Sequence, residues 1–244
     1  MVLNKYKIVL IITALAIVLV YCQVPKRGVN SVEFNDSATT GSLAKISAEA
    51  GKGHNHPSFV IWQENLQGEV IRTLFVTKSY ASGIFGHENV DDSLWLDRPG
   101  KSYQPSALPY WTFRKGLLGG KTFVPTPENP FVDAVTGATP EAGFSLNVRL
   151  EKIVGTRILM EVNQAWDWNE HWTNDRIPNN EAYKHSAQPS LIYAVTIDSS
   201  DSVFYLNPIG HGEPTGANGK LFTDLSGFTT AKEIFKNIKI TIEN

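Results

Sequence analysis

The stretch 166–175 concentrates side chains that could bind a carbohydrate. It reads Trp-Asp-Trp-Asn-Glu-His-Trp-Thr-Asn-Asp and sets three tryptophans among acids, amides and a histidine. Indole rings stack on the apolar faces of sugars, while nearby polar groups hydrogen-bond the hydroxyls. The oxygen ligands would also suit calcium, although their spacing matches no EF-hand. We expect either a glycan-binding loop or a loop whose tryptophans plug one end of the fold, and the candidate ligand residues are Trp166, Asp167, Trp168, His171 and Trp172.

Histidines offer a second kind of chemistry. His54 and His56 alternate just before an expected strand, so both imidazoles could point the same way and bind a metal ion. His171, His185 or His211 would have to supply a distant third ligand. The alternative is that these histidines are ordinary loop residues, since most stand among Gly, Asn and Ser.

Motifs for catalysis are missing from the sequence. It has no Gly-x-Ser-x-Gly, no His-Glu-x-x-His, no phosphate-binding loop and no cysteine after residue 22. Glu64, Glu161 and Glu170 could form a pair of carboxylates like that of a glycosidase, but a sequence does not give their separation. We therefore expect a protein that is not an enzyme.

The heptad 133–139 reads Asp-Ala-Val-Thr-Gly-Ala-Thr. It resembles the sequence Asp-x-x-Ser/Thr-Gly-Ala-Thr, on whose last threonine flavin transferases build a phosphoester with flavin mononucleotide (FMN). The resemblance implies covalent FMN on Thr139 and a role in electron transfer. The alternative is a structural turn closed by side-chain to backbone hydrogen bonds. The cofactor-binding residues so implied are Asp133, Thr136, Gly137, Ala138 and the acceptor Thr139.

The first 22 residues have the pattern of an export signal. Lys5 and Lys7 precede an apolar run from residue 8 to 20, which ends near Cys22. The run is shorter than the ~20 residues that cross a bilayer comfortably, which favours a signal peptide over a permanent span. Cys22 follows Leu-Val-Tyr and resembles the lipidated cysteine of bacterial lipoproteins. The alternatives are an uncleaved anchor, or cleavage nearby that leaves an unmodified thiol.

The remaining chain has the composition of an ordinary folded domain. The formal net charge is −2, and leaving out Lys5 and Lys7 brings the exported part to about −4. Acids and bases are interspersed, so no stretch would neutralise phosphates and we expect no nucleic-acid partner. Residues 23–41 are polar and read as a flexible tether, and the folded domain is expected to span 42–244.

Apolar residues in that domain recur with period two, which is typical of β-strands. Gly68 lies where a hairpin turn needs a positive φ, so the second and third strands should pair. Short helical pieces are expected at 107–114 and 230–236. The excursions 79–131 and 166–189 are too long for simple turns, and such excursions often carry function. The expected strands lie at 43–48, 59–62, 70–76, 144–150, 157–162, 191–197, 203–206 and 238–242.

Four stretches, 56–64, 68–74, 108–111 and 133–140, together resemble a family of predicted periplasmic proteins of unknown function. The resemblance covers most of the chain from about residue 44. It implies an immunoglobulin-like sandwich similar to that of the flagellar hook-cap protein. Its members tend to be encoded beside flavin transferases and membrane redox proteins, which implies a redox neighbourhood and no particular reaction.

These features predict an exported, membrane-tethered, all-β protein, with one antiparallel immunoglobulin-like β-sandwich, two long loop insertions and little helix. We expect a binding or accessory component of an extracytoplasmic redox or metal-handling system, without a cofactor of its own. The alternatives are an electron carrier with FMN on Thr139 and a glycan-binding module. The expected partners are the membrane, through the N-terminus, and a flavin transferase or membrane redox protein. The expected location is the periplasm or the cell surface.

Overall fold

The computed structural model describes residues 31–91, 94–116, 122–198 and 201–243. The expected signal segment 1–22, with its candidate lipidation site Cys22, lies outside the described residues. None of the helices in the described ranges has the length and apolar character that a bilayer crossing requires.

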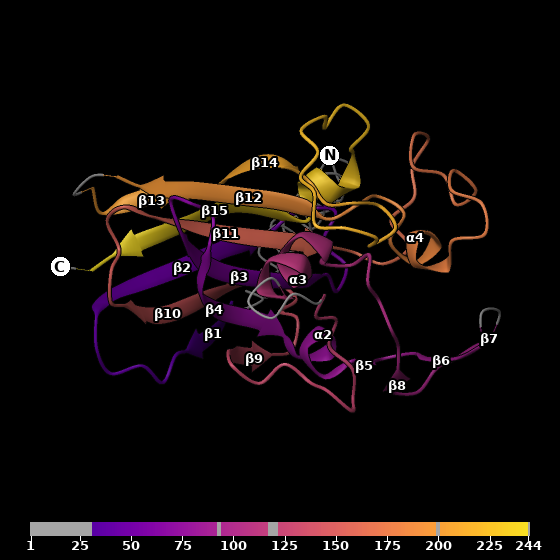
Figure 1. Cartoon of the computed structure of the whole chain (residues 1–244), viewed down its shortest axis with the longest axis horizontal. Coiled ribbons are helices and arrows are strands. Elements are labelled where there is room, and N and C mark those ends of the chain that lie inside the picture. The colour runs from indigo at the N-terminus through magenta and orange to yellow at the C-terminus, as the bar shows by residue number, and fades with distance from the viewer. Residues whose placement is uncertain (1–30, 92–93, 117–121, 199–200, 244) are drawn as a thin grey trace, which may run out of the picture. The chain divides into compact units, whose positions relative to one another are not determined.

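Two large β-sheets pack face to face and form a sandwich (Figure 1). Sheet A has the strand order β1-β10-β2-β15-β13, and sheet B has the order β14-β12-β11-β3-β4-β9. Two small sheets, β5-β8 and β6-β7, lie outside the sandwich. The strand bounds are β1 Val32–Asn35, β2 Ser42–Ala50, β3 Ser58–Asn65, β4 Val70–Thr77, β5 Ile84–Phe85, β6 Glu88–Asp91, β7 Leu94–Leu96, β8 Gly100–Lys101, β9 Val135–Gly137, β10 Gly143–Leu150, β11 Thr156–Asn163, β12 Leu191–Ile197, β13 Val203–Tyr205, β14 Asn207–His211 and β15 Phe235–Ile242. The all-β sandwich is confirmed.

The central strands are connected as in immunoglobulin-like sandwiches. Strands β2 and β10 are neighbours in sheet A, and the strands that follow them along the chain, β3 and β11, are neighbours in sheet B. Strands B and E of immunoglobulin domains, with their successors C and F, have this arrangement. The sheets are mixed and not wholly antiparallel as expected, because β1 pairs parallel with β10 and β9 pairs parallel with β4. Both parallel strands join at an edge from distant parts of the chain, where no hairpin turn imposes antiparallel pairing.

The predicted hairpin and helices are present. Strands β3 and β4 pair antiparallel, and Gly68 in their turn has φ +83°. The expected helix at 107–114 is α3, Pro109–Gly116, and the expected helical piece at 230–236 is a short 3-10 turn, Thr230–Glu233, that leads into β15. The other helices are α2, Lys78–Ser82, and α4, Glu181–Ser186.

The main core lies between the two sheets. Buried residues alternate with partly buried ones along the middle of β2 and in β10 from Leu146 to Leu150, which is the period that the sequence predicts. Phe59 of β3 stacks between Phe75, at 5.0 Å, and Phe144 of the opposite sheet, at 4.9 Å between ring centroids. Burying each such ring stabilises the fold by about 1.5–3 kcal/mol, so this stack joins the sheets firmly.

Sheet B is covered on its outer face too, which makes a third layer. Trp62, Leu159 and Ile192 point away from sheet A and are fully buried. The chain between β4 and β9 covers them with α2 and α3, and Figure 1 shows α3 lying over β3 and β11. Trp111 of α3 is fully buried and donates a 3.1 Å hydrogen bond from Nε1 to Thr73 of β4. The first long excursion is therefore part of the scaffold.

The sandwich includes residues that the sequence assigned to the tether. Strand β1 lies within 23–41 and pairs with β10 from Val32 to Asn35, ten positions before the expected start at residue 42. Phe34 packs on Phe75, at 4.7 Å between ring centroids, and Arg72 pairs with Asp36. Composition alone does not show that one aromatic side chain and one acid before residue 42 contact the sandwich.

Candidate functional site

The tryptophan loop, residues 166–175, lies at the end of the sandwich that also carries α4 (Figure 1). Trp166 and Trp168 are 47% and 44% exposed, and their rings meet edge to face at 5.7 Å. The backbone N–H of Trp166 donates to the carbonyl of His185, and Trp168 Nε1 donates to the carbonyl of Lys184 at 3.1 Å. Contacts with α4 thus hold both side chains in place, while both remain exposed to solvent.

The backbone of Trp166 has φ +62°, in the left-handed region that bulky residues rarely adopt. Such a conformation costs of order 1–3 kcal/mol and persists only where surrounding contacts impose it. Strained backbone of this kind is frequent at binding sites, and here it lies under an exposed aromatic side chain.

Asp167 has a structural role instead of facing solvent. It is 9% exposed, accepts a hydrogen bond from the hydroxyl of Thr230, and its backbone carbonyl accepts one from Gln188 at 3.0 Å. Burial raises its pKa above the ordinary value. Its Oδ2 is buried without a hydrogen-bond partner among the described residues. Of the loop residues that the sequence singled out, this one anchors the loop to the 3-10 turn.

Asn169 ties the loop to the segment that precedes β15. Its Oδ1 accepts hydrogen bonds from the backbone N–H groups of His171 and Trp172, at 2.9 and 2.6 Å. Its Nδ2 donates to the carbonyl of Gly227 and the hydroxyl of Thr229, at 3.0 and 2.9 Å. One amide therefore turns the loop and brings it against residues 227–229.

A pocket of about 340 Å³ opens between this loop and residues 211–227. Trp172 and His211 are 7% and 6% exposed, and their rings meet edge to face at 5.8 Å. Phe222 stacks on His211 at 5.2 Å with 17° between the ring planes. We call this site the His211 pocket, and its lining residues are His171, Trp172, Arg176, His211, Pro214, Phe222, Asp224 and Gly227.

His211 is held in one orientation. Its Nδ1 lies 2.7 Å from the carbonyl oxygen of Gly212, which can only accept, so Nδ1 carries a proton. Burial lowers the pKa of His211, so the ring is neutral at pH 7 and Nε2 is a hydrogen-bond acceptor. Buried Trp172 Nε1 has no acceptor among the described residues.

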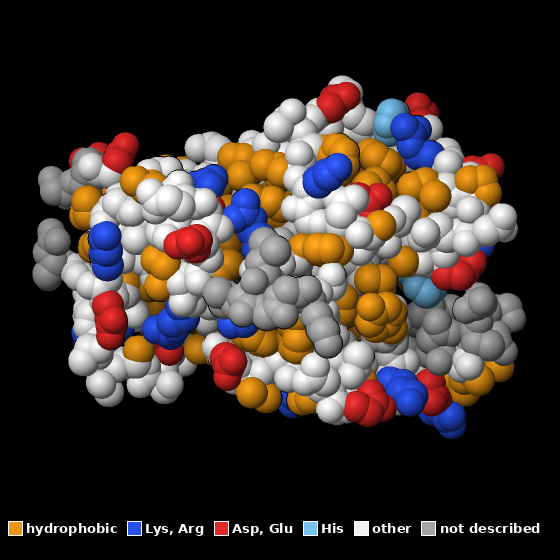
Figure 2. Space-filling view, in the orientation of Figure 1, with side chains coloured by type: hydrophobic (Ala, Val, Ile, Leu, Met, Phe, Trp, Pro, Cys, Tyr) orange, Lys and Arg blue, Asp and Glu red, His pale blue; other side chains and the backbone are white. Residues whose placement is uncertain are grey.

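The rim of the His211 pocket carries one charge of each sign. The guanidinium of Arg176 lies over the ring of Trp172 at 4.8 Å and donates to the carbonyl of His171 at 2.8 Å. Asp224 accepts a hydrogen bond from the backbone N–H of Ser226 at 2.9 Å. Hydrogen bonding with Ser226 and the nearby His171 and His211 lower the pKa of Asp224. Figure 2 shows the same mixture more widely, since acidic and basic side chains are interspersed over the face in view.

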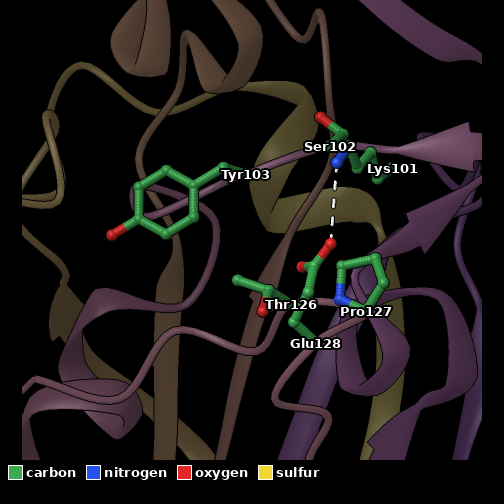
Figure 3. A pocket seen from close by; sticks show the side chains of 6 residues that line it. All are labelled: Lys101, Ser102, Tyr103, Thr126, Pro127 and Glu128. Atoms are coloured by element: carbon green, nitrogen blue, oxygen red, sulfur yellow. Dashed lines mark ion pairs between the residues drawn. The ribbon is translucent and has the colours of Figure 1, made fainter.

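A smaller pocket of about 220 Å³ lies on the first excursion. Figure 3 shows Lys101 and Glu128 facing one another across it, with 3.5 Å between Nζ and Oε1, while Tyr103 points to one side. Both charged side chains are more than two-thirds exposed, at 73% and 69%. Exposed ion pairs of this kind contribute little to stability.

The heptad 133–139, which resembles a flavin-acceptor sequence, lies at the edge of sheet B. Its middle residues form strand β9. The side chains of Asp133, Thr136 and Ala138 are exposed, whereas Thr139 is half-buried. The hydroxyl of Thr139 donates a 3.0 Å hydrogen bond to the carbonyl of Pro57. Gly137 is needed here because a Cβ would lie 2.1 Å from the ring of Phe34.

The two candidate metal ligands, His54 and His56, have no third ligand beside them within the described ranges. Burial lowers the pKa of His54, whose Nε2 is buried without a hydrogen-bond partner in the described part of the chain, while His56 is exposed and has φ +50°. Among the described residues, no three His, Cys, Asp or Glu side chains are placed so that they could hold a metal ion. His171 and His211 share the pocket instead, and His185 packs against Trp166.

The three glutamates from which a catalytic pair was considered have different surroundings. Glu170 is exposed, whereas Glu64 and Glu161 are fully buried beneath α3. Glu64 binds Arg157 at 2.7 Å and Arg114 at 3.3 Å, and so anchors the last turn of α3. Glu161 accepts three hydrogen bonds near the first turn, and burial raises its pKa to about 7. Both carboxylates are used in holding the third layer.

No known family model matches the chain, and no curated protein resembles it significantly. The sequence pattern pointed to Trp172 and His171 but not to Arg176, Phe222 or Asp224, and it left His211 as either a distant metal ligand or an ordinary loop residue. The Gly-His-Gly context of His211 is typical of a loop. The contacts that make it part of a pocket join it to Phe222 and, 39 positions away, to Trp172.

Proposed function

We propose that this chain is an exported binding protein without turnover of its own and that it recognises glycans through the tryptophan loop. The observation that carries the proposal is the pair of exposed, nearly perpendicular rings of Trp166 and Trp168. Rings fixed in this way lose little side-chain entropy when a sugar stacks on them. The proposal includes membrane tethering, which the pattern of the first 22 residues favours, and a place beside redox or metal-handling partners, of which the family resemblance implies the redox part.

The backbone contacts of the loop support this function. Hydrogen bonds from Trp166, Trp168 and Asn169 fix the loop before any ligand arrives, so binding needs little ordering. A loop that only plugged the sandwich would bury its tryptophans. Trp172 does plug the core in this way, whereas the other two do not.

The test is calorimetric titration of the full chain, in mild detergent, with cello-, chito- and malto-tetraose. Calorimetry is preferred to emission because the variants lose fluorophores. We expect saturable binding of at least one glycan, with a loss of at least ten-fold in affinity for the double variant Trp166→Ala/Trp168→Ala. Tyr205→Ala is the matched control, since Tyr205 is 55% exposed on β13 of sheet A. Absence of binding by the unmodified chain, or equal affinity in the double variant, contradicts the proposal.

A second candidate function is covalent attachment of FMN, favoured by the position of the motif on an exposed sheet edge. A flavin transferase would join the FMN phosphate of FAD to Thr139 Oγ1 and release AMP. The hydroxyl would first give up its hydrogen bond to Pro57, and its proton would pass to the transferase. The protein could then carry electrons.

Coexpression with a flavin transferase tests this candidate. We expect intact-mass analysis to show the gain of one FMN, which disappears in Thr139→Ala and persists in Thr223→Ala, an exposed threonine outside the motif. An unmodified mass in the parent chain would refute it. A glycan-binding result does not affect this outcome.

A further inference from the structure

The His211 pocket offers an acceptor that receives no hydrogen bond from the described residues. With Nδ1 engaged by Gly212, Nε2 of neutral His211 is the ring atom left to accept a hydrogen bond. Phe222 on one face and Trp172 at the edge hold the ring still. An acceptor among aromatic walls selects a ligand that combines an O–H or N–H donor with an apolar surface.

The rim of the pocket adds one hydrogen-bond acceptor and one donor, and their two charges cancel. Asp224 accepts only, while Arg176 donates only. Because one guanidinium and one carboxylate face the same opening, neither an anion nor a cation gains from the sum of the charges. A ligand with several hydroxyls can use both groups, since each hydroxyl donates and accepts.

We propose that the His211 pocket binds a single neutral sugar ring, whose hydroxyls donate to Nε2 of His211 and to Asp224 and accept from Arg176. The inference rests on the proposed function and names a second subsite for it, separate from Trp166 and Trp168. A volume of about 340 Å³ is at the lower end of small-ligand sites, which run from about 300 to 1,000 Å³, so one ring fits better than a chain.

Two other ligand classes fit less well. A metal ion would need His171, His211 and Asp224 together, but no such three-ligand group exists among the described residues. An anion such as a phosphate would be repelled by the carboxylate of Asp224 at the rim. Among the residues that line the pocket, Arg176 alone carries a fixed positive charge.

The experiment titrates the full chain with the methyl glycosides of glucose, galactose, mannose and N-acetylglucosamine, followed by saturation-transfer NMR and calorimetry. His211→Phe keeps the aromatic stack but removes both ring nitrogens, and we expect it to lower affinity at least ten-fold. Asp224→Asn keeps an acceptor for Ser226 and should weaken binding several-fold. Asp97→Asn is the matched control, because the side chain of Asp97 is 96% exposed.

The outcomes separate the two proposals. If tetraoses bind through Trp166 and Trp168 while monosaccharides do not bind, or bind equally to both pocket variants, the pocket inference is overturned and the proposed function stands. If no tetraose binds, the proposed function fails and the pocket inference fails with it. Should His211→Phe not fold, Asp224→Asn decides, since Asp224 lies on the exposed rim.

Discussion

The backbone N–H of Trp111 donates a 2.8 Å hydrogen bond to Oε2 of fully buried Glu161. The N–H of Tyr110 and the hydroxyl of Ser190 donate to Oε1 at 3.1 and 2.5 Å. Helix α3 has no acidic residue in its own first turn. A glutamate on strand β11 therefore caps the helix from below and holds the third layer on sheet B.

Removing this cap should destabilise the protein. In Glu161→Ala, two backbone N–H groups and a hydroxyl lose their acceptor in a buried site, and each unsatisfied group costs about 1–3 kcal/mol. We expect the free energy of unfolding to fall by about 3 kcal/mol or more in urea titration. Glu170→Ala, on the exposed tryptophan loop, should change it by less than about 0.5 kcal/mol. Equal stability of the two variants would show that Glu161 does not cap α3.

The stability contributed by Glu161 should depend on pH. Burial raises its pKa from 4.5 to about 7, so the folded protein keeps a proton that the unfolded chain releases. This contribution is complete below pH 4.5 and is lost as pH rises through 7. Glu161→Gln imitates the protonated acid and lacks this titration.

The measurement is urea unfolding of both proteins across this range. The unfolding free energy of the parent chain, minus that of Glu161→Gln, should fall by up to about 3 kcal/mol between pH 4 and pH 8. His54 and His211, whose pKa values are lowered, impose the opposite trend on both proteins and cancel in the difference. A difference that does not change with pH would contradict the prediction.

Gly137 and Phe34 should be coupled energetically. A Cβ at position 137 would lie 2.1 Å from Cε1 of Phe34, so Gly137→Ala should destabilise the chain by about 1–3 kcal/mol. In Phe34→Ala the obstruction is gone, and the same glycine substitution should cost much less. A double-mutant cycle on thermal or urea unfolding measures the coupling, and purely additive effects would rule out the contact.

Position 166 should prefer glycine to alanine. The φ of +62° costs an L-residue roughly 1–2 kcal/mol, whereas glycine adopts it freely. Both substitutions remove the indole ring, so their difference isolates the backbone. Trp166→Gly should be more stable than Trp166→Ala by about 1 kcal/mol in equilibrium unfolding, and both should bind glycans equally weakly. Greater stability of the alanine variant would show that the loop relaxes.

The local pattern of the chain predicts the scaffold well. A period-two pattern, loose at 43–48, predicted β2 and β10, Gly68 predicted the hairpin, and the 107–114 pattern predicted α3. The pairing of β1 with β10 and that of β9 with β4 could not be predicted. Parallel edge strands are fixed by contacts between distant residues, such as that of Phe34 with Gly137. The burial of the outer face of sheet B could not be predicted either. Trp62 and Ile61 are both apolar, and the sequence does not show what packs against each of them.

The candidate site was predictable only in part. Clustered indoles marked the tryptophan loop, but their exposure depends on how Asn169 and Asp167 fasten that loop to residues 227–230. His211 acquires its role from Phe222 and Trp172, which lie in other loops. Nothing about a lone histidine between two glycines signals such neighbours.

The burial of sheet B on both sides restricts how this chain can be shortened for production. A truncation that replaced 78–134 with a short linker would expose Trp62, Leu159 and Ile192 as a continuous apolar surface. We expect such a product to aggregate. The solvent side of sheet A is different, because β2 and β15 present lysines and glutamates there, such as Lys45, Glu49 and Lys239. Affinity tags and immobilisation chemistry belong on that side, where they leave the loop end of the molecule accessible.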